Sequence, residues 1–254
     1  MKSKKNSKEY WEDRLPWAWK SKTVEDYREM RRRRYELQDY MKVVFPWHIW
    51  KGKRVLEVGC GTGIDSIEFE DNGAIVNAVD FTDKAVDHAQ HLKQLLGKQF
   101  KISKASATSL PFEDSSFDLV YSYGVLHHIP DVNKAVSEIH RVLKPTGKVW
   151  AMLYHRDSLL YIYSIIFLRG IQQGLLEESS EEELFARFSE YKEYCPYSKA
   201  YTIDEAYALF NIFINVTVEP YYNVYDTTNE RKIKVHNLPK RLGFHLIVKG
   251  EKAP

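Results

Sequence analysis

Cysteine is scarce in this chain, since only Cys60 and Cys195 occur among 254 residues. Two cysteines do not make a disulfide framework, which excludes the disulfide-rich secreted class and favours a reducing, cytoplasmic setting. Long hydrophobic runs are also missing: the longest uncharged apolar stretch, residues 158–168, is too short to cross a bilayer. The lysine-rich residues 1–9 lack the apolar segment of a secretory signal. We therefore expect a cytoplasmic protein without a transmembrane segment.

An excess of one charge sign is absent too. The formal net charge is +2 although 28% of the residues are charged, so bulk electrostatics give no reason to expect a nucleic-acid partner. Aromatic residues, in contrast, are plentiful, with 17 Tyr, 12 Phe and 6 Trp to line a pocket. The length and a hydrophobic content of 44% fit one large α/β domain with additions.

The most informative stretch begins with a short apolar run at residues 54–58, which is typical of a buried parallel strand. Glycines follow at alternate positions, Gly59, Gly61 and Gly63, and then comes an amphipathic segment. A strand, a glycine turn and a helix let backbone N–H groups approach a ligand closely. A dinucleotide site would require glycine where Ile64 stands, so an NAD-dependent dehydrogenase is the weakest of the possible functions.

Residues 57–63, Glu-Val-Gly-Cys-Gly-Thr-Gly, have the E-x-G-x-G-x-G pattern that resembles motif I of class I S-adenosylmethionine (SAM) dependent methyltransferases. A second apolar strand, residues 74–79, ends at Asp80, where an acidic side chain can accept both ribose hydroxyls. Residues 106–131 look like the adenine loop and fourth-strand motif of the same family, in the subgroup that includes small-molecule and quinone methyltransferases. The resemblance covers residues 53–153.

The resemblance implies SAM as the cofactor and a set of residues that hold it. These are Glu57, Gly59, Cys60, Gly61, Thr62, Gly63, Asp80, Phe81, Thr82, Ser106, Ala107, Thr108, Tyr123, Gly124 and His127. Related enzymes often have an acidic residue where Ser106 stands, so we expect a weaker adenine contact. Residues 122–125 lack the Asn/Asp-Pro-Pro-aromatic tetrad, which argues against an adenine or glutamine-amide acceptor. They also lack a carboxylate, so no metal is expected.

Three histidines are candidate catalytic residues. A neutral imidazole of His127 or His128 near the sulfonium can remove a proton from the acceptor. Alternatively, one of the pair closes over the cofactor while the other packs against or caps the next helix. His155 and Arg156 follow the fifth expected strand and can supply a base or bind an anion; the alternative is that Arg156 pairs with Asp157.

Candidate acceptor-binding residues are Arg34, Tyr35, Tyr123, Tyr154, Arg156 and Tyr197. Tyr123 and Tyr154 end expected strands, and ligands of open α/β sheets bind outside the carboxyl ends of strands. Arg34 and Tyr35 are similar to residues that close over the cofactor in related enzymes, although residues 31–34 also fit a solvated helix face.

As the resemblance implies, the expected fold is a Rossmann-like, doubly wound α/β sheet of seven mostly parallel strands with the last one antiparallel. We divide the chain into an N-terminal helical cap (1–50), a SAM-binding core (51–154), a helical lid (155–200) and the end of the sheet (201–254), which carries an irregular insertion at 220–240. Strands are expected at 54–58, 74–79, 100–102, 117–123, 148–154, 212–218 and 243–249, and helices at 83–96, 132–143 and after Ser180 and Thr202.

The expected function is transfer of the SAM methyl group to an O, N or C nucleophile of a small-molecule acceptor. Two alternatives stay open. One is a SAM-binding partner subunit without catalytic activity. The other is a peripheral-membrane lipid or quinone methyltransferase, because the apolar residues 159–168 can either cover a bound acceptor or contact a membrane. The sequence does not indicate the oligomeric state.

Overall fold

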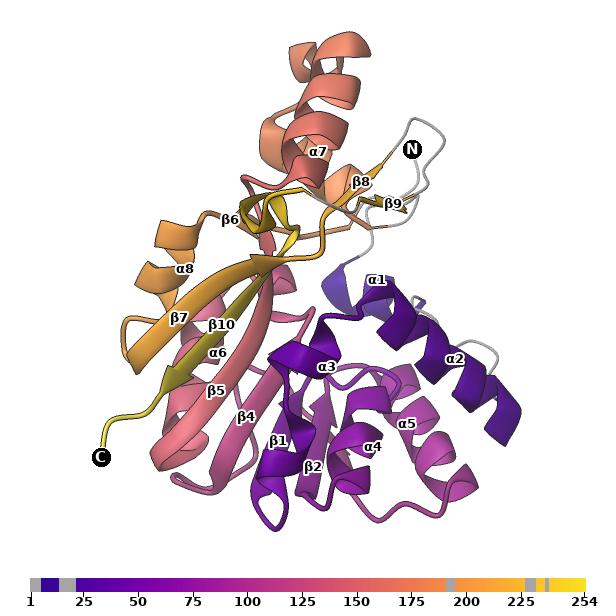
Figure 1. The fold of residues 1–254 in the computed structure, drawn as a ribbon, viewed down its shortest axis with the longest axis vertical. Helices are drawn as coiled ribbons and strands as arrows, with labels where there is room; N and C mark the ends of the chain where they lie inside the picture. The colour runs from indigo at the N-terminus through magenta and orange to yellow at the C-terminus, as the bar shows by residue number, and fades with distance from the viewer. Residues whose placement is uncertain (1–5, 14–21, 191–194, 227–231, 236–237) are drawn as a thin grey trace.

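The computed structural model describes residues 6–13, 22–190, 195–226, 232–235 and 238–254, and its centre is one twisted sheet (Figure 1). The strand order is β3-β2-β1-β4-β5-β10-β7, and the short β6 pairs with β5. The strands are β1 (Arg54–Val58), β2 (Ile75–Asp80), β3 (Lys101–Lys104), β4 (Phe117–Tyr123), β5 (Leu143–His155), β6 (Ala200–Tyr201), β7 (Ile214–Tyr221) and β10 (His245–Glu251). Strand β10 is antiparallel to β5 and β7, and the other pairs among these described strands are parallel, so the expected fold class is confirmed.

Helices cover both faces of the sheet. One face carries α2 (Val24–Leu37), α3 (Met41–Val44), η1 (Trp47–Trp50), α4 (Ile64–Asp71) and α5 (Asp83–Leu95). The other face carries α6 (Val132–Val142) and α8 (Ile203–Leu209). The remaining helices are α1 (Ser7–Glu12), η2 (Leu126–His128), the π-helix η3 (Leu160–Gln172), η4 (Leu175–Glu177), α7 (Glu181–Phe188) and η5 (Lys240–Leu242).

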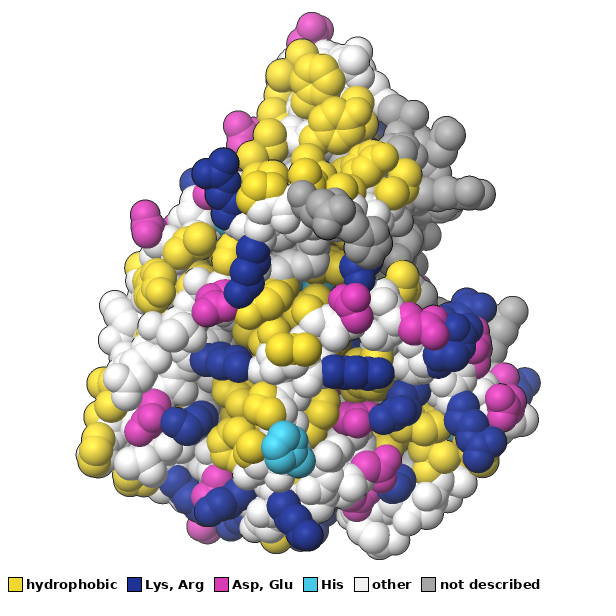
Figure 2. Space-filling model, in the orientation of Figure 1, with side chains coloured by type: hydrophobic (Ala, Val, Ile, Leu, Met, Phe, Trp, Pro, Cys, Tyr) yellow, Lys and Arg dark blue, Asp and Glu magenta, His cyan; other side chains and the backbone are white. Residues whose placement is uncertain are grey.

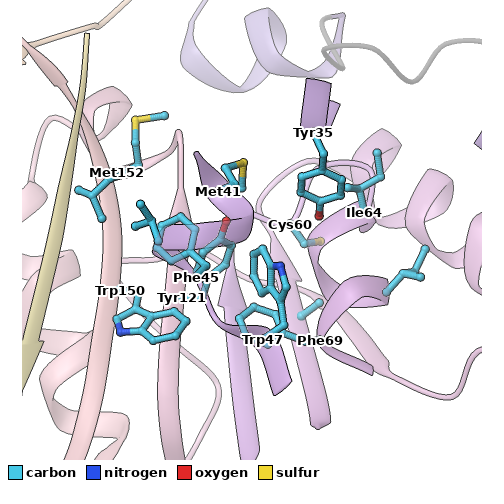
Figure 3. Close-up of a cluster of buried hydrophobic side chains, with 14 of the residues drawn as sticks. Tyr35, Met41, Phe45, Trp47, Cys60, Ile64, Phe69, Tyr121, Trp150 and Met152 are labelled. Atoms are coloured by element: carbon cyan, nitrogen blue, oxygen red, sulfur yellow. The ribbon is translucent and has the colours of Figure 1, made fainter. Parts of the chain in front are cut away.

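The core on the α4 side is rich in aromatic side chains (Figure 3). Leu119 and Tyr121 of β4 point into it, whereas Val120 between them joins the core on the α6 side, because successive strand residues face opposite sides of a sheet. Trp47 meets Phe69 edge to face, with ring centroids 4.7 Å apart, and Phe45 meets Tyr121 in the same way at 5.4 Å. The residues just before β1 are therefore built into the main core.

A buried carboxylate attaches helix α2 to this core. Asp65, at the start of α4, is 3% exposed and accepts a hydrogen bond of 2.9 Å from the Arg34 Nε. The hydroxyls of Tyr35 and Tyr121 donate to the same carboxylate, each at 2.9 Å. One turn earlier on α2, Arg31 binds Glu68 of α4 through two donors, at 2.9 and 3.0 Å. The resulting network fixes the end of α2 beside the carboxyl edge of β4.

Several local expectations are confirmed. Ser180 and Thr202 begin α7 and α8 with reciprocal capping boxes to Glu183 and Glu205. Asp131 caps α6 by accepting from the backbone N–H of Lys134. Strands β1 and β4 have the expected bounds.

Two local expectations differ from the structure. Strand β5 begins at Leu143, five residues before the expected start, because the stretch read as a helix stop already pairs in the sheet, through Leu143 with Phe117 of β4 and through Thr146 with Lys252 near the chain end. The insertion expected to be irregular contains a hairpin of β8 (Val224–Asp226) and β9 (Lys232–Lys234). The apolar segment at residues 159–168 is helical as expected, in the form of the π-helix η3, whose buried residues recur four to five positions apart. None of the helices that the structure describes is long and apolar enough to span a bilayer.

Replacing Arg34 by methionine should leave the buried Asp65 carboxylate without its charged partner. We expect the free energy of unfolding to fall by about 3–5 kcal/mol, as for other broken buried ion pairs. Urea denaturation followed by circular dichroism measures this change. The matched control is Arg33→Met on the same helix, since Arg33 pairs only with the exposed Glu29 among the described residues and should matter little. Equal losses for both variants would contradict a special role for Asp65.

Candidate functional site

A cavity of about 590 Å³ opens at the carboxyl edge of the sheet and crosses the ends of β2, β1, β4 and β5. Most of the residues that the sequence predicts for the site line it. They are Arg34, Glu57, Gly59, Cys60, Gly61, Thr62, Asp80, Phe81, Thr82, Ser106, Ala107, Thr108, Tyr123, Gly124, His128 and Tyr154. The parallel pairing of β1 with both β2 and β4 brings these strand ends together.

The glycine loop after β1 leaves its backbone open to this cavity. The N–H groups of Gly59 and Cys60 donate to the Val79 carbonyl of β2, at 2.8 and 3.0 Å. Gly59 has φ +76°, and a Cβ there would lie 2.2 Å from the Val125 side chain, so only glycine fits. Gly61 has φ +52°, and nothing described lies within 4 Å of where its Cβ would be. The loop is therefore packed tightly behind Gly59 and open in front of Gly61.

Asp80 is held at the end of β2 by three donors. The Gly61 N–H donates to Oδ2 at 2.9 Å, and the Thr82 N–H and hydroxyl donate to Oδ1 at 3.0 and 2.9 Å. Because both oxygens are anchored while the residue still lines the cavity, the carboxylate presents its remaining lone pairs in a fixed direction.

Glu57 lies beneath the loop and is 4% exposed. Burial, together with the nearby Asp65 carboxylate, raises the pKa of Glu57, which also accepts a hydrogen bond from the Ser66 hydroxyl. A carboxyl group in this setting holds its proton more tightly than an exposed one and can donate as well as accept.

The far end of the cavity contains polar groups that the sequence reading missed. They are Trp11, Gln38, Glu190 and His245. The position of His245 could have been predicted from the sequence. The last strand was expected to run antiparallel, so the start of that strand had to lie at the same edge of the sheet as the last residues of β4 and β5. The partner of His245 in the ladder is Tyr154.

The two adjacent histidines differ in their surroundings. His128 lines the cavity, its Nδ1–H donates to the Tyr197 carbonyl at 3.1 Å, and its Nε2 lies 3.5 Å from Glu190 Oε1. Burial alone would lower the pKa of His128, but hydrogen bonds to Cys195 and Glu190 raise it to about 9. His127 is fully buried with its ring centroid 3.7 Å from that of Tyr154, and burial lowers its pKa well below the usual value.

Six other predicted site residues do not line the cavity, as far as the described residues define its wall: Tyr35, Gly63, His127, His155, Arg156 and Tyr197. Tyr35 binds Asp65, and Tyr197 contributes its carbonyl to His128. His155 is 1% exposed and donates from Nδ1 to the Gly243 carbonyl at 2.8 Å. Across the described part of the chain, no three His, Cys, Asp or Glu residues are grouped to hold a metal ion.

Helix α1 closes one side of the cavity. Ser7 and Trp11 line it, and the Trp11 ring lies 4.7 Å from that of His128. The Glu12 carboxylate accepts hydrogen bonds from the backbone N–H groups of Asp83 and Lys84, at 2.8 and 3.1 Å, in the first turn of α5. This short helix thus extends along the cavity from the end near Asp80, where adenosine is expected, to the end that contains His128.

Comparison with known proteins agrees with this geometry. Residues 56–151 match the family described as "Methyltransferase domain". A ubiquinone biosynthesis O-methyltransferase of Coxiella burnetii is 28% identical over 140 residues, which are 55% of this chain and 60% of that protein. The chain thus matches about three fifths of the length of this curated relative.

Solved structures share the fold at low sequence identity. A SAM-dependent methyltransferase from Methanosarcina mazei superposes with a TM-score of 0.59 and 22% identity, covering 81% of this chain and 96% of that one. Magnesium protoporphyrin IX methyltransferase from Synechocystis, solved with bound S-adenosylhomocysteine (SAH), gives 0.60 and 14%, covering 98% and 96%. Residues 56–151 thus match a methyltransferase domain, and the structure shares the fold of SAM-dependent methyltransferases, in agreement with the resemblance read from the glycine motif.

The raised pKa of His128 predicts a pH-dependent contribution to stability. Its pKa in the folded state lies above the ordinary value of about 6.5, so its stabilising effect is complete below about pH 6.5 and is lost as the pH rises through about 9. Comparing wild type with His128→Gln by urea denaturation should show a difference that shrinks by an amount on the order of 3 kcal/mol from about pH 6 to about pH 10. A difference that is the same at both ends would contradict the ion pair with Glu190.

Proposed function

We propose that this protein binds SAM across the glycine loop and transfers its methyl group to a small-molecule acceptor in the same cavity. The observation that carries the proposal is the continuity of this cavity, which runs from Asp80 at the end of β2 to Tyr154 and His245 at the far end. A cofactor and an acceptor need such a shared space, because holding the two in line is a large part of catalysis of group transfer.

The residues present fit SAM. Gly61 offers an open backbone face, where a side chain would occupy part of the cavity, and the anchored Asp80 carboxylate suits a pair of ribose hydroxyls. Phe81 and residues 105–108 would enclose the adenine. When bound, SAM supplies a methyl group on a cationic sulfur. The chain's own part is to orient the cofactor, exclude water with α1 and hold the acceptor beside Tyr123.

We also propose that the methylated atom of the acceptor is an oxygen. The Coxiella relative is named as an O-methyltransferase of ubiquinone biosynthesis, which favours an oxygen nucleophile here. A SAM-binding subunit without activity would need no acceptor pocket, whereas this cavity has aromatic and titratable groups at its far end, including Tyr154, His128 and Glu190.

Replacing Asp80 by alanine should weaken SAM binding by about 1–3 kcal/mol, because charge-assisted hydrogen bonds to the ribose are lost. Isothermal titration calorimetry with SAM and with SAH measures this directly. Asp80 also holds the N–H of Gly61, so Asp80→Asn serves as a second variant that keeps an acceptor oxygen for the loop. Unchanged SAM affinity in both variants would contradict the assignment of Asp80 to the ribose. Absence of SAM and SAH binding to wild type would contradict the proposed function.

A specific surface feature favours a second candidate function, that of a peripheral-membrane lipid or quinone methyltransferase. Helix η3 turns four large apolar side chains outward, among them Ile162 and Ile171 at 51% and 62% exposure. Figure 2 shows hydrophobic side chains gathered over the upper part of the molecule, where Figure 1 places α7 and the helix beside it. Exposed apolar groups on one short helix can insert into the boundary of a bilayer.

Flotation with phosphatidylcholine liposomes tests this second candidate. We expect wild type to float with the vesicles and the double variant Ile162→Asp/Ile171→Asp to stay at the bottom of the gradient, because charge on the apolar face opposes insertion. The control is Val43→Asp/Ile49→Asp, which alters two exposed apolar residues on α3 and η1 and should float normally. Wild type that never floats, or a control that also stays down, would contradict a membrane role for η3.

A further inference from the structure

Two phenols and an imidazole form a hydrogen-bonded cluster at the acceptor end of the cavity. The Tyr40 hydroxyl lies 2.7 Å from Nδ1 of His245, and the Tyr123 hydroxyl lies 3.1 Å from the same nitrogen. The two hydroxyls also hydrogen-bond each other, and the Tyr123 hydroxyl can instead donate to Gln38 Oε1, 2.9 Å away. Tyr123 and His245 line the cavity, whereas Tyr40 lies behind them.

The imidazole of this cluster is held rigidly. The ring of Tyr222 stacks on His245 with centroids 4.7 Å apart and an interplanar angle of 28°, and Tyr123 meets the same imidazole edge to face at 5.9 Å. Tyr222 has φ +67°, a left-handed conformation that costs energy in any residue but glycine. Backbone strain of this kind is concentrated at functional sites, and here it fixes a ring against His245.

The hydrogen bonds define a direction for proton transfer. With Nδ1 of His245 unprotonated, the Tyr40 hydroxyl donates to it, and the Tyr123 hydroxyl can then turn from Gln38 Oε1 to donate to the Tyr40 oxygen. The Tyr123 oxygen is left able to accept a proton from a group in the cavity. Burial raises the pKa of both Tyr40 and Tyr123, which keeps them neutral phenols that pass protons on rather than store charge. The Arg34 guanidinium, 5.0 Å from the centre of the Tyr123 ring, favours negative charge that develops briefly there.

We propose that Tyr123 takes the proton of an aromatic hydroxyl acceptor and passes it through Tyr40 to His245. The inference rests on the proposed function and deepens it by naming an acceptor class and a catalytic residue. The walls at this end, formed by Tyr123, Tyr154, Tyr222 and Trp11, suit a flat ring. A phenol also needs such a relay, because it becomes a strong nucleophile only when its proton leaves.

The step is balanced. The acceptor O–H bond breaks and its proton moves to the Tyr123 oxygen while the Tyr123 proton moves to Tyr40 and the Tyr40 proton to Nδ1, which leaves an imidazolium. The electron pair on the acceptor oxygen forms the new bond to the methyl carbon, and the pair of the S–CH₃ bond stays on sulfur to give the thioether. Tyr123 is the catalytic residue of this proposal, and Tyr40 and His245 act through it.

The test uses 4-nitrophenol, whose phenolate absorbs at a longer wavelength than the phenol, with protein saturated with SAH. At one pH below the pKa of the free probe, wild type should bind it with about tenfold or more phenolate than in solution, which corresponds to a shift of about one pKa unit. Tyr123→Phe and His245→Gln should still bind SAH but lose the excess phenolate. Tyr221→Phe is the matched control, since its hydroxyl binds Glu219 outside the cavity and its ring stacks on Tyr40.

The experiment distinguishes failure of the relay from failure of the proposed methyl transfer. Excess phenolate in wild type and in Tyr221→Phe, but not in the two relay variants, supports the relay. The relay is overturned if wild type binds SAH without binding the probe, if the bound probe stays protonated, or if the relay variants keep the phenolate signal. Failure of wild type to bind SAH would overturn the proposed methyl transfer itself. Thermal unfolding of each variant shows whether a lost signal reflects a lost fold.

Discussion

The buried carboxylate of Asp65 is the constraint on which the site depends. It stands at the start of α4, directly after the glycine loop, and takes hydrogen bonds from α2 and from β4. A buried carboxylate without partners would be very costly, so the helix that supplies Arg34 must dock where it does. Docking in turn brings Gln38 and Tyr40, at and beyond the end of α2, to the carboxyl edge of the sheet, where they reach Tyr123.

The direction of the strands explains why so much chemistry meets at one edge. Parallel β1, β2, β4 and β5 all end there, which brings together the glycine loop, Asp80, Tyr123 and Tyr154. The antiparallel β10 begins at the same edge and adds His245. The proposed cofactor half of the cavity is therefore formed by backbone and one carboxylate, and the proposed acceptor half by aromatic rings and imidazoles.

Sequence alone predicted the sheet well because its strands are short apolar runs bounded by glycine, proline and capping residues. The same local signals placed the glycine loop and Asp80, whose positions depend on neighbours close along the chain. The acceptor half of the cavity was harder to predict from sequence, because Gln38, Glu190 and His245 are brought together only by tertiary packing. His128 was named from sequence, but its pairing with Glu190 depends on the helical insertion at residues 155–200, whose position no local pattern specifies. The π-helical form of η3 was missed for a related reason, since an apolar run does not distinguish it from an α-helix.

The central claim is that one crevice, between the glycine loop and the end of β4, holds both reactants. A crystal structure of the protein with SAH tests it most directly. We expect electron density for the nucleoside with its ribose hydroxyls on Asp80 and its thioether sulfur directed toward the Tyr123 side of the cavity. SAH bound elsewhere, or a ribose that does not contact Asp80, would show that this crevice does not hold the cofactor as proposed.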